Sequence, residues 1–296
     1  MWTAADIPGL AGRTAVVTGA TAGIGFATAK ALGERGAHVV LAVRDEARGA
    51  EAAARIAGST AVARLDLAAL DSVRWAAADI AERYPRVDLL VNNAALWSPT
   101  RAETGDGFEL QFGVNHLGHF AFTGLLLGRM LASPGSRIVT VSSVSHRGGR
   151  LDLADLPMAA GYQHGAAYAR SKLANLLFAF ELQRRLVAVG AAAASLAAHP
   201  GGVWTSLFRG ANPKLLVHTL GRLMTQSPER GAWPILRAAT DPEARGGEYY
   251  GPGGMGELKG SPKLVRASAD ARDETLARRL WDESERLTGV RFPPSP

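Results

Sequence analysis

Short β-branched segments alternate with helix-length segments along most of this 296-residue chain. Such alternation builds right-handed βαβ units, which assemble into a parallel sheet covered by helices on both faces. The sequence therefore predicts an α/β fold, and no repeat or linker divides residues 1–296 into two domains. The predicted strands are residues 14–18, 37–43, 60–65, 87–92, 137–141 and 192–197, and the predicted helices are residues 23–34, 46–57, 71–83, 108–131 and 166–188.

Two segments interrupt the alternation. Residues 144–165 are loop-like, with Gly148, Gly149 and Pro157, and residues 204–227 carry scattered large apolar side chains. The ending Arg291–Pro296 is rich in proline, and we expect it to fray.

The composition excludes several classes of function. The chain has no cysteine, so it forms no disulfide, thiolate zinc site, iron–sulfur cluster or thiol nucleophile. Its net charge of +6 comes from basic residues interspersed with acids, as in Arg44-Asp45-Glu46, which favours a solvated surface over nucleic-acid binding. There is no leader pattern, and the apolar runs are too short to span a bilayer, so we expect a cytoplasmic protein.

A glycine-rich turn joins the first predicted strand to the first predicted helix. Gly19, Gly23 and Gly25 permit a tight turn and a close approach of a pyrophosphate to the helix N-terminus, where free N–H groups favour anions. A glycine-rich turn also occurs in ordinary strand–helix connections, but the flanking strand and helix favour a dinucleotide site. No Gly-Lys-Ser/Thr follows, which excludes a Walker loop.

The end of the second predicted strand indicates which dinucleotide binds. An acid usually holds a 2′-hydroxyl at this point, and a cation holds a 2′-phosphate. Here Val43 is followed by Arg44, whose planar guanidinium suits a phosphate, with Arg48 one helical turn further on. NADP(H) is therefore preferred, while NAD(H) stays open because Asp45 and Glu46 are adjacent.

Tyr168 and Lys172 stand four residues apart, on one face of the predicted helix 166–188. A free tyrosine has a pKa of about 10, so acid–base work near neutrality needs a depression of roughly three units. A nearby ammonium supplies that stabilisation. Such pairs also arise by chance, but Ser143 follows the buried strand 137–141, at the edge where open parallel sheets bind ligands.

In this combination and order, the residues resemble the short-chain dehydrogenase/reductase family. Segments 115–120 and 168–175 are most similar to its retinol-dehydrogenase-like and protochlorophyllide-reductase-like branch. The resemblance implies one Rossmann-type doubly wound sheet of about seven strands, in the order 3-2-1-4-5-6-7. It extends over essentially the whole chain and rests on residues 18–25, Asp66-Leu67, residues 92–95, Asn115, Ser143, Tyr168 with Lys172, and residues 199–205.

The resemblance also implies roles for single residues. Tyr168 would be the general acid/base, Lys172 would bind the nicotinamide ribose and lower the pKa of Tyr168, Ser143 would bind the substrate oxygen, and Asn115 would hold a relay water. The cofactor would contact Gly19, Thr21, Ala22, Gly23, Ile24, Gly25, Arg44, Asp66, Leu67, Asn93, Ala94, Tyr168, Lys172, Pro200, Gly201, Val203 and Thr205.

The substrate is expected to be a lipophilic alcohol, aldehyde or ketone. Trp97, Ser143 and Leu207 would contact it, with walls from residues 144–165 and 204–227. The apolar side chains expected to line those walls are Leu151, Leu153, Leu156, Met158, Tyr162, Leu207, Phe208, Leu215 and Met224. The alternative is that the two segments simply cover the sheet. Family members commonly pair through the helix that carries Tyr168 and the preceding helix, so a homodimer or homotetramer is expected.

Other functions stay open beside that of an alcohol dehydrogenase or carbonyl reductase. A non-catalytic NADP-binding sensor would share the glycine turn, and a C=C reductase would share the fold, although such enzymes typically use a cysteine. His116 and His119 have no third ligand at a recognised spacing, so we expect packing histidines and no metal. Ala22 and Ala95 depart from the family pattern, where a basic residue and a glycine are usual.

Overall fold

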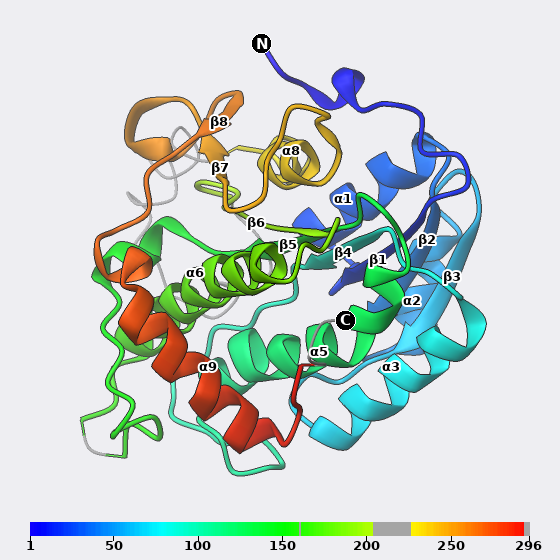
Figure 1. Ribbon diagram of the computed structural model, residues 1–296. Coiled ribbons are helices and arrows are strands. Elements are labelled where there is room, and N and C mark those ends of the chain that lie inside the picture. Colours follow the sequence, from blue (N-terminus) through cyan, green and yellow to red (C-terminus); the bar gives the residue numbers. More distant parts are fainter. Residues whose placement is uncertain (160, 204–225, 293–296) are drawn as a thin grey trace.

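The sheet of this protein is doubly wound, with helices on both faces. The structure is a computed structural model, and it describes residues 1–159, 161–203 and 226–292 (Figure 1). Within these residues, eight strands form one sheet in the order β3-β2-β1-β4-β5-β6-β7-β8. The expected order is therefore confirmed, and β8 extends the sheet by pairing antiparallel with β7. The strands are β1 (Thr14–Thr18), β2 (His38–Val43), β3 (Thr60–Arg64), β4 (Leu89–Asn92), β5 (Arg137–Val141), β6 (Ala194–Ala198), β7 (Tyr249–Pro252) and β8 (Pro262–Leu264).

Hydrophobic cores lie on both faces of the sheet. Helices α1 (Gly23–Glu34), α2 (Glu46–Ala53) and α8 (Pro228–Thr240) pack on one face. Helices α3 (Leu70–Arg83), α5 (Gly118–Leu131) and α6 (His164–Ala188) pack on the other. Inner strands such as β4 are buried on both faces, which explains their continuous apolar runs. None of the described helices is long and apolar enough to cross a membrane.

The helix predicted over residues 108–131 is broken into three parts. It begins as α4 (Leu110–Phe112), continues as a π-helical turn, η2 (Gly113–Leu117), and becomes α5 at Gly118. A π turn carries one extra residue per turn and is common at functional sites. Here it places Asn115 where the helix passes the ends of the strands.

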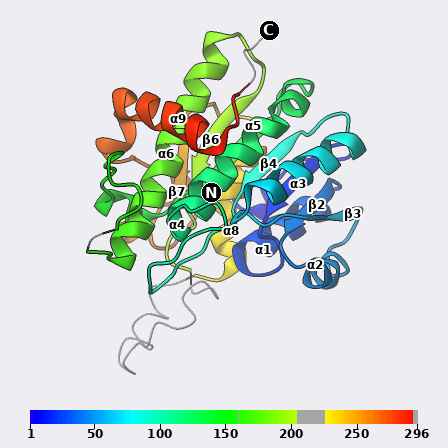
Figure 2. The ribbon, with the colours of Figure 1, turned by 90° about the horizontal axis from the view of Figure 1, so that it is seen from below.

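The C-terminal part of the described chain covers the helices of the second face. Helix α9 (Glu274–Thr288) packs across α6 and α5 (Figure 2). The Trp281 ring stacks on Phe178 at 5.8 Å between centroids, and the Phe292 ring lies 4.4 Å from Trp281. The prediction that the tail frays is wrong at Phe292, because its ring finds an apolar surface on α5 and α9.

The face expected for self-association is therefore covered within the chain. Every residue from 167 to 179 of α6 is buried, and so is every residue from 111 to 124 in and before α5. A stretch of helix buried on all sides leaves no apolar stripe for a second copy.

Candidate active site

The glycine turn between β1 and α1 has the conformation that a dinucleotide site requires. Gly19 and Gly23 have φ values of 67° and 58°, in the left-handed region that favours glycine. A side chain at Gly19 would meet Ala94 at 2.9 Å, and one at Gly25 would collide with Asn93. Among the described residues, no side chain caps the N-terminus of α1. Its first N–H groups thus fit a pyrophosphate.

The ends of β1 and β4 are tied together beside this turn. The Thr18 hydroxyl oxygen accepts hydrogen bonds from the backbone N–H groups of Asn93 and Ala94, both at 2.9 Å. The Asn93 side chain donates to the Thr18 carbonyl, also at 2.9 Å. Asn93 and Ala94 therefore lie against the glycine turn, as predicted for cofactor contacts.

The residues predicted to hold the adenosine half of the cofactor follow β2 and β3. Arg44 is exposed directly after β2. Asp45 instead accepts a hydrogen bond from the Arg48 N–H at 3.1 Å and so caps α2. Asp66 accepts from the Ala68 N–H at 3.0 Å. Asp45, next to Arg44, thus has a structural role.

Tyr168, Lys172 and Ser143 meet at the carboxyl end of β5. Tyr168 and Lys172 lie one turn apart in α6, with the Lys172 ammonium 5.7 Å from the centre of the Tyr168 ring. Lys172 donates to the carbonyl of Val141 at 3.1 Å. Ser143 follows β5 and caps the short 3₁₀ helix η3 (Val144–Gly148). The structure thus brings together three of the predicted catalytic side chains.

Burial is the largest influence on the pKa values of Tyr168 and Lys172. It raises the pKa of Tyr168 to about 12, although a hydrogen bond with Ser143 acts in the opposite direction. Burial also lowers the pKa of Lys172 to about 7. In the chain alone, desolvation destabilises the charged forms of both Tyr168 and Lys172. That Lys172 lowers the pKa of Tyr168 stays a prediction.

Asn115 connects the π turn to α6. Its side-chain oxygen accepts from the Leu96 N–H at 2.8 Å. Its amide nitrogen donates to the Leu96 carbonyl and to the Ser171 hydroxyl, both at 3.0 Å. Ser171 in turn donates to the carbonyl of Tyr168 at 2.8 Å. Asn115 thereby fixes the backbone of α6 beside the Tyr168 side chain.

Segment 144–165 is held against α6 by a residue that the sequence analysis did not single out. Arg170 is 3% exposed and donates to the carbonyls of Asp155 and Leu156 at 2.8 and 2.7 Å. Its guanidinium also lies 3.6 Å from the carboxylate of Glu109. The only sequence signal was its place between Tyr168 and Lys172, which puts it on another face of the helix.

The structure describes only some of the residues that were expected to contact the substrate. Leu156 is buried in the core beneath α6, and Leu151 and Leu153 pack against that core, as the alternative of a cover over the sheet would have it. Trp97 packs edge-on against His164 at 5.0 Å between ring centres. Thr205 and Leu207, like Phe208, Leu215 and Met224, lie outside the described residues.

The turn after Ser143 is tied to the cofactor segment that follows β6. Glu257 accepts from Arg147 at 2.8 Å and from the buried His199 at 3.1 Å. These hydrogen bonds lower the pKa of Glu257 to about 2, with the contribution of His199 the largest. Pro200 and Gly201 come directly after His199, so Glu257 links this segment to η3. No local pattern marked Glu257, since it lies far along the chain from both partners.

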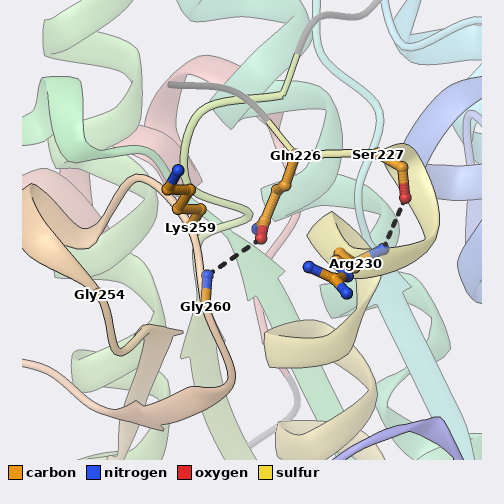
Figure 3. Close-up of a pocket in the computed structure, with 6 residues that line it drawn as sticks. All are labelled: Gln226, Ser227, Arg230, Gly254, Lys259 and Gly260. Atoms are coloured by element: carbon orange, nitrogen blue, oxygen red, sulfur yellow. Dashed lines mark hydrogen bonds between the residues drawn. The ribbon is translucent and has the colours of Figure 1, made fainter. Parts of the chain in front are cut away.

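A cavity of about 660 Å³ lies beside the N-terminus of α8 (Figure 3). Gln226 crosses one side, accepting from the Gly260 N–H at 3.3 Å and donating to the Pro200 carbonyl at 2.8 Å. Val203 pairs with Gln226, which places the cavity next to the predicted nicotinamide segment. Its described lining includes none of Tyr168, Lys172 and Ser143. The lining residues are Gln226, Ser227, Arg230, Gly254, Lys259 and Gly260.

This combination of fold and site defines a family of oxidoreductases. The family model of short chain dehydrogenases matches residues 13–215. The chain belongs to the short-chain dehydrogenase/reductase family and to its retinol-dehydrogenase-like branch.

The chain is similar to two characterised dehydrogenases over nearly all of its length. It is 46% identical to polyprenol dehydrogenase of Mus musculus, over 96% of this chain and 86% of that protein. It is 41% identical to retinol dehydrogenase 14 of Homo sapiens, over 96% of this chain and 88% of that protein. The chain is therefore an oxidoreductase of the class that acts on CH–OH and C=O groups.

Solved structures show the same fold. An uncharacterized protein from Mycobacterium paratuberculosis matches with a TM-score of 0.84 and 43% identity, over 99% of both chains. The Pseudomonas aeruginosa RhlG/NADP active-site complex matches with a TM-score of 0.66 and 26% identity, over 81% of this chain and 94% of that one.

Proposed function

We propose that this protein is an NADP(H)-dependent dehydrogenase/reductase that interconverts a lipophilic alcohol and its aldehyde or ketone. The observation that carries this proposal is the buried group at the end of β5, where Tyr168 meets Ser143 and lies one turn from Lys172. Retinol and polyprenol, named for the two relatives, are lipophilic alcohols, which supports the substrate class.

Tyr168 is the general acid/base in this proposal. In reduction it donates its proton to the carbonyl oxygen, while the Ser143 hydroxyl donates a second hydrogen bond to the same oxygen. In oxidation the Tyr168 phenolate takes the proton of the alcohol, and a charged Lys172 stabilises that phenolate. The nicotinamide, when bound, supplies or accepts the hydride.

The residues around the glycine turn fit the dinucleotide. The free N–H groups of α1 suit the pyrophosphate, and the exposed Arg44 suits a 2′-phosphate. Asp45, one of the two acids that leave NAD(H) open, is engaged in capping α2, whereas Glu46 is exposed. The likeness to the RhlG/NADP complex supports the same preference.

The first test compares wild type with Tyr168→Phe. With NADPH and a panel of aliphatic, isoprenoid and aromatic aldehydes and ketones, we expect wild type to turn over and the variant to lose about 10³-fold in kcat. Removing one hydroxyl keeps the ring in place, so NADPH affinity should stay within a few-fold. NADPH binding without turnover across the panel would instead favour a redox sensor, and reduction of an enone at carbon would favour a C=C reductase.

The second test concerns Arg44. Arg44→Ser removes the guanidinium at the end of β2, so KM for NADPH should rise about 10-fold or more while KM for NADH changes little. Arg48→Ser is the matched control on the same surface, with a smaller expected effect. Equal changes in both KM values for Arg44→Ser would contradict the assignment of NADP(H).

A further inference from the structure

We propose that His119 is a positioning residue that couples the cofactor turn to the catalytic helix. This inference rests on the proposed function, since it assigns His119 to that same site. The contacts of His119 run in two directions, toward Thr18 in the glycine turn and toward Asn115 in the π turn.

The histidine ring bridges two segments that are distant in sequence. His119 is 1% exposed, at the start of α5. Its Nδ1 lies 3.1 Å from the backbone carbonyl of Asn115, and its Nε2 lies 2.9 Å from the Thr18 hydroxyl. Both ring nitrogens therefore have partners, and both partners belong to segments that the proposed chemistry uses.

The chemistry of the partners determines the tautomer. Burial lowers the pKa of His119 to about 3, so the ring is neutral and carries one proton. The Asn115 carbonyl can only accept, so Nδ1 carries that proton and donates it. Nε2 is then an acceptor for the Thr18 hydroxyl proton. The Val91 carbonyl also lies within reach of that hydroxyl, at 3.4 Å, but His119 is closer, at 2.9 Å, so the hydroxyl donates to Nε2. Thr18 still accepts from Asn93 and Ala94, so the direction of each hydrogen bond is fixed.

The network continues from His119 to the catalytic tyrosine. Asn115, whose carbonyl His119 holds, donates through its side chain to Ser171 at 3.0 Å. Ser171 donates to the carbonyl of Tyr168 at 2.8 Å. A buried chain of directed hydrogen bonds thus joins the turn that would hold the pyrophosphate to the helix that holds the phenol.

His116, in the π turn just before α5, shows what a merely structural histidine looks like. It is also 1% exposed, and burial lowers its pKa to about 3 as well. Its Nε2, however, bonds to Ser284 of α9 at 2.9 Å, away from the glycine turn. The two histidines match in burial and ionisation and differ in what they hold, so His116 serves as the control.

The experiment tests separately the hydrogen bond of His119 to Asn115 and that to Thr18. His119→Phe removes both hydrogen bonds, His119→Asn keeps a donor near the position of Nδ1, and His119→Gln keeps an acceptor near that of Nε2. For each variant we would measure the affinity for NADPH by fluorescence, kcat with a carbonyl substrate of the wild type, and the melting temperature. His116→Phe and Ser284→Ala are measured beside them.

We expect His119→Phe to lose about 10-fold or more in NADPH affinity and in kcat, because small displacements of reacting groups cost large factors in rate. His119→Gln should recover affinity more than kcat, and His119→Asn should recover kcat more than affinity. His116→Phe should lower the melting temperature comparably while both activities stay within about 2-fold. Thr18→Val should weaken NADPH binding in wild type but add little in the His119→Phe background.

The proposal falls if His119→Phe behaves like His116→Phe, losing melting temperature alone, or if wild type binds no NADPH. Wild type that binds NADPH but turns over no carbonyl compound or alcohol would refute the proposed function. The affinities of the His119 variants would still decide whether His119 positions the cofactor turn.

Discussion

Lys172 shows how burial sets the chemistry of a single residue. Its side chain is 1% exposed and donates to the Val141 carbonyl, and burial brings its pKa down to about 7. Tyr168 shifts the other way, to about 12. The uncharged phenol suits reduction, in which it gives up a proton. Oxidation needs the phenolate, so we expect the oxidation rate to rise with pH.

The same shift makes the stability of the cofactor-free protein depend on pH. Between pH 7 and about 10 the unfolded chain keeps the Lys172 proton that the folded chain releases, so the fold gains stability as pH rises. From pH 7 to 9 we expect a gain of about 2 kcal/mol in the free energy of unfolding. Urea unfolding of wild type and Lys172→Met measures it. A rise of equal size in both proteins would contradict the assignment.

At the scale of elements, α6 has two roles: it presents the predicted catalytic side chains on one face and binds the preceding segment on another. One face presents Tyr168 and Lys172, and Arg170 on another face binds the carbonyls of Asp155 and Leu156. The segment before the helix is thus fastened to it by a buried guanidinium, in addition to the apolar packing of Leu156 and the hydrogen bond from Arg101 to the Pro157 carbonyl.

Arg170→Met should release this segment. The change removes two backbone hydrogen bonds and leaves the Glu109 carboxylate buried without its nearest guanidinium, at a cost of about 3 kcal/mol. Thermolysin should then cleave residues 150–165 at least 10-fold faster. The exposed Arg150→Met is the control, and its cleavage rate should equal that of wild type. Equal rates for both variants would show that Arg170 does not hold the segment.

Elements with a strong local signal could be predicted from sequence. The predicted bounds 14–18, 23–34 and 137–141 are those of β1, α1 and β5, since each has a regular hydrophobic pattern and a clear end. Tyr168, Lys172 and Ser143 meet as predicted, because the carboxyl ends of parallel strands share one edge of the sheet.

What could not be predicted depends on distant partners. Several contacts join residues that are far apart in sequence and meet only in the folded chain. They are the contacts of Glu257 with Arg147 and His199, of His119 with Thr18, and of Phe292 with Trp281. Residues 228–292 form α8, β7, β8 and α9, none of which is among the elements predicted from the sequence. The π turn at Asn115 also has no local signature, since its helical pattern is like that of a regular helix.

At the scale of the whole molecule, α9 covers the outer faces of α6 and α5. Trp281 is 2% exposed and stacks on Phe178, and Arg185 lies 4.3 Å from the centre of its ring. The helix faces that a homodimer or homotetramer was expected to use are thus covered from within the chain. A second copy could pair there only by displacing α9.

We therefore expect a monomer of 31.1 kDa in solution, measured by light scattering after gel filtration. Trp281→Ala should lower the free energy of unfolding by about 3–5 kcal/mol, because it empties a buried site on α6. Leu264→Ala, at an exposed position, is the control and should change the free energy of unfolding by less than about 0.5 kcal/mol. A stable dimer through α5 and α6 would contradict this view of α9.

The packing of α9 and Phe292 on α6 also affects how the chain folds during its synthesis. The ribosome adds Trp281 and Phe292 well after it has added Tyr168, so the catalytic helix emerges with its outer face bare. Until those two rings arrive, the apolar side chains of that face are open to water and to other nascent chains. The site at the end of β5 can therefore become rigid only late in synthesis, and a truncated chain would expose the helix that carries its chemistry.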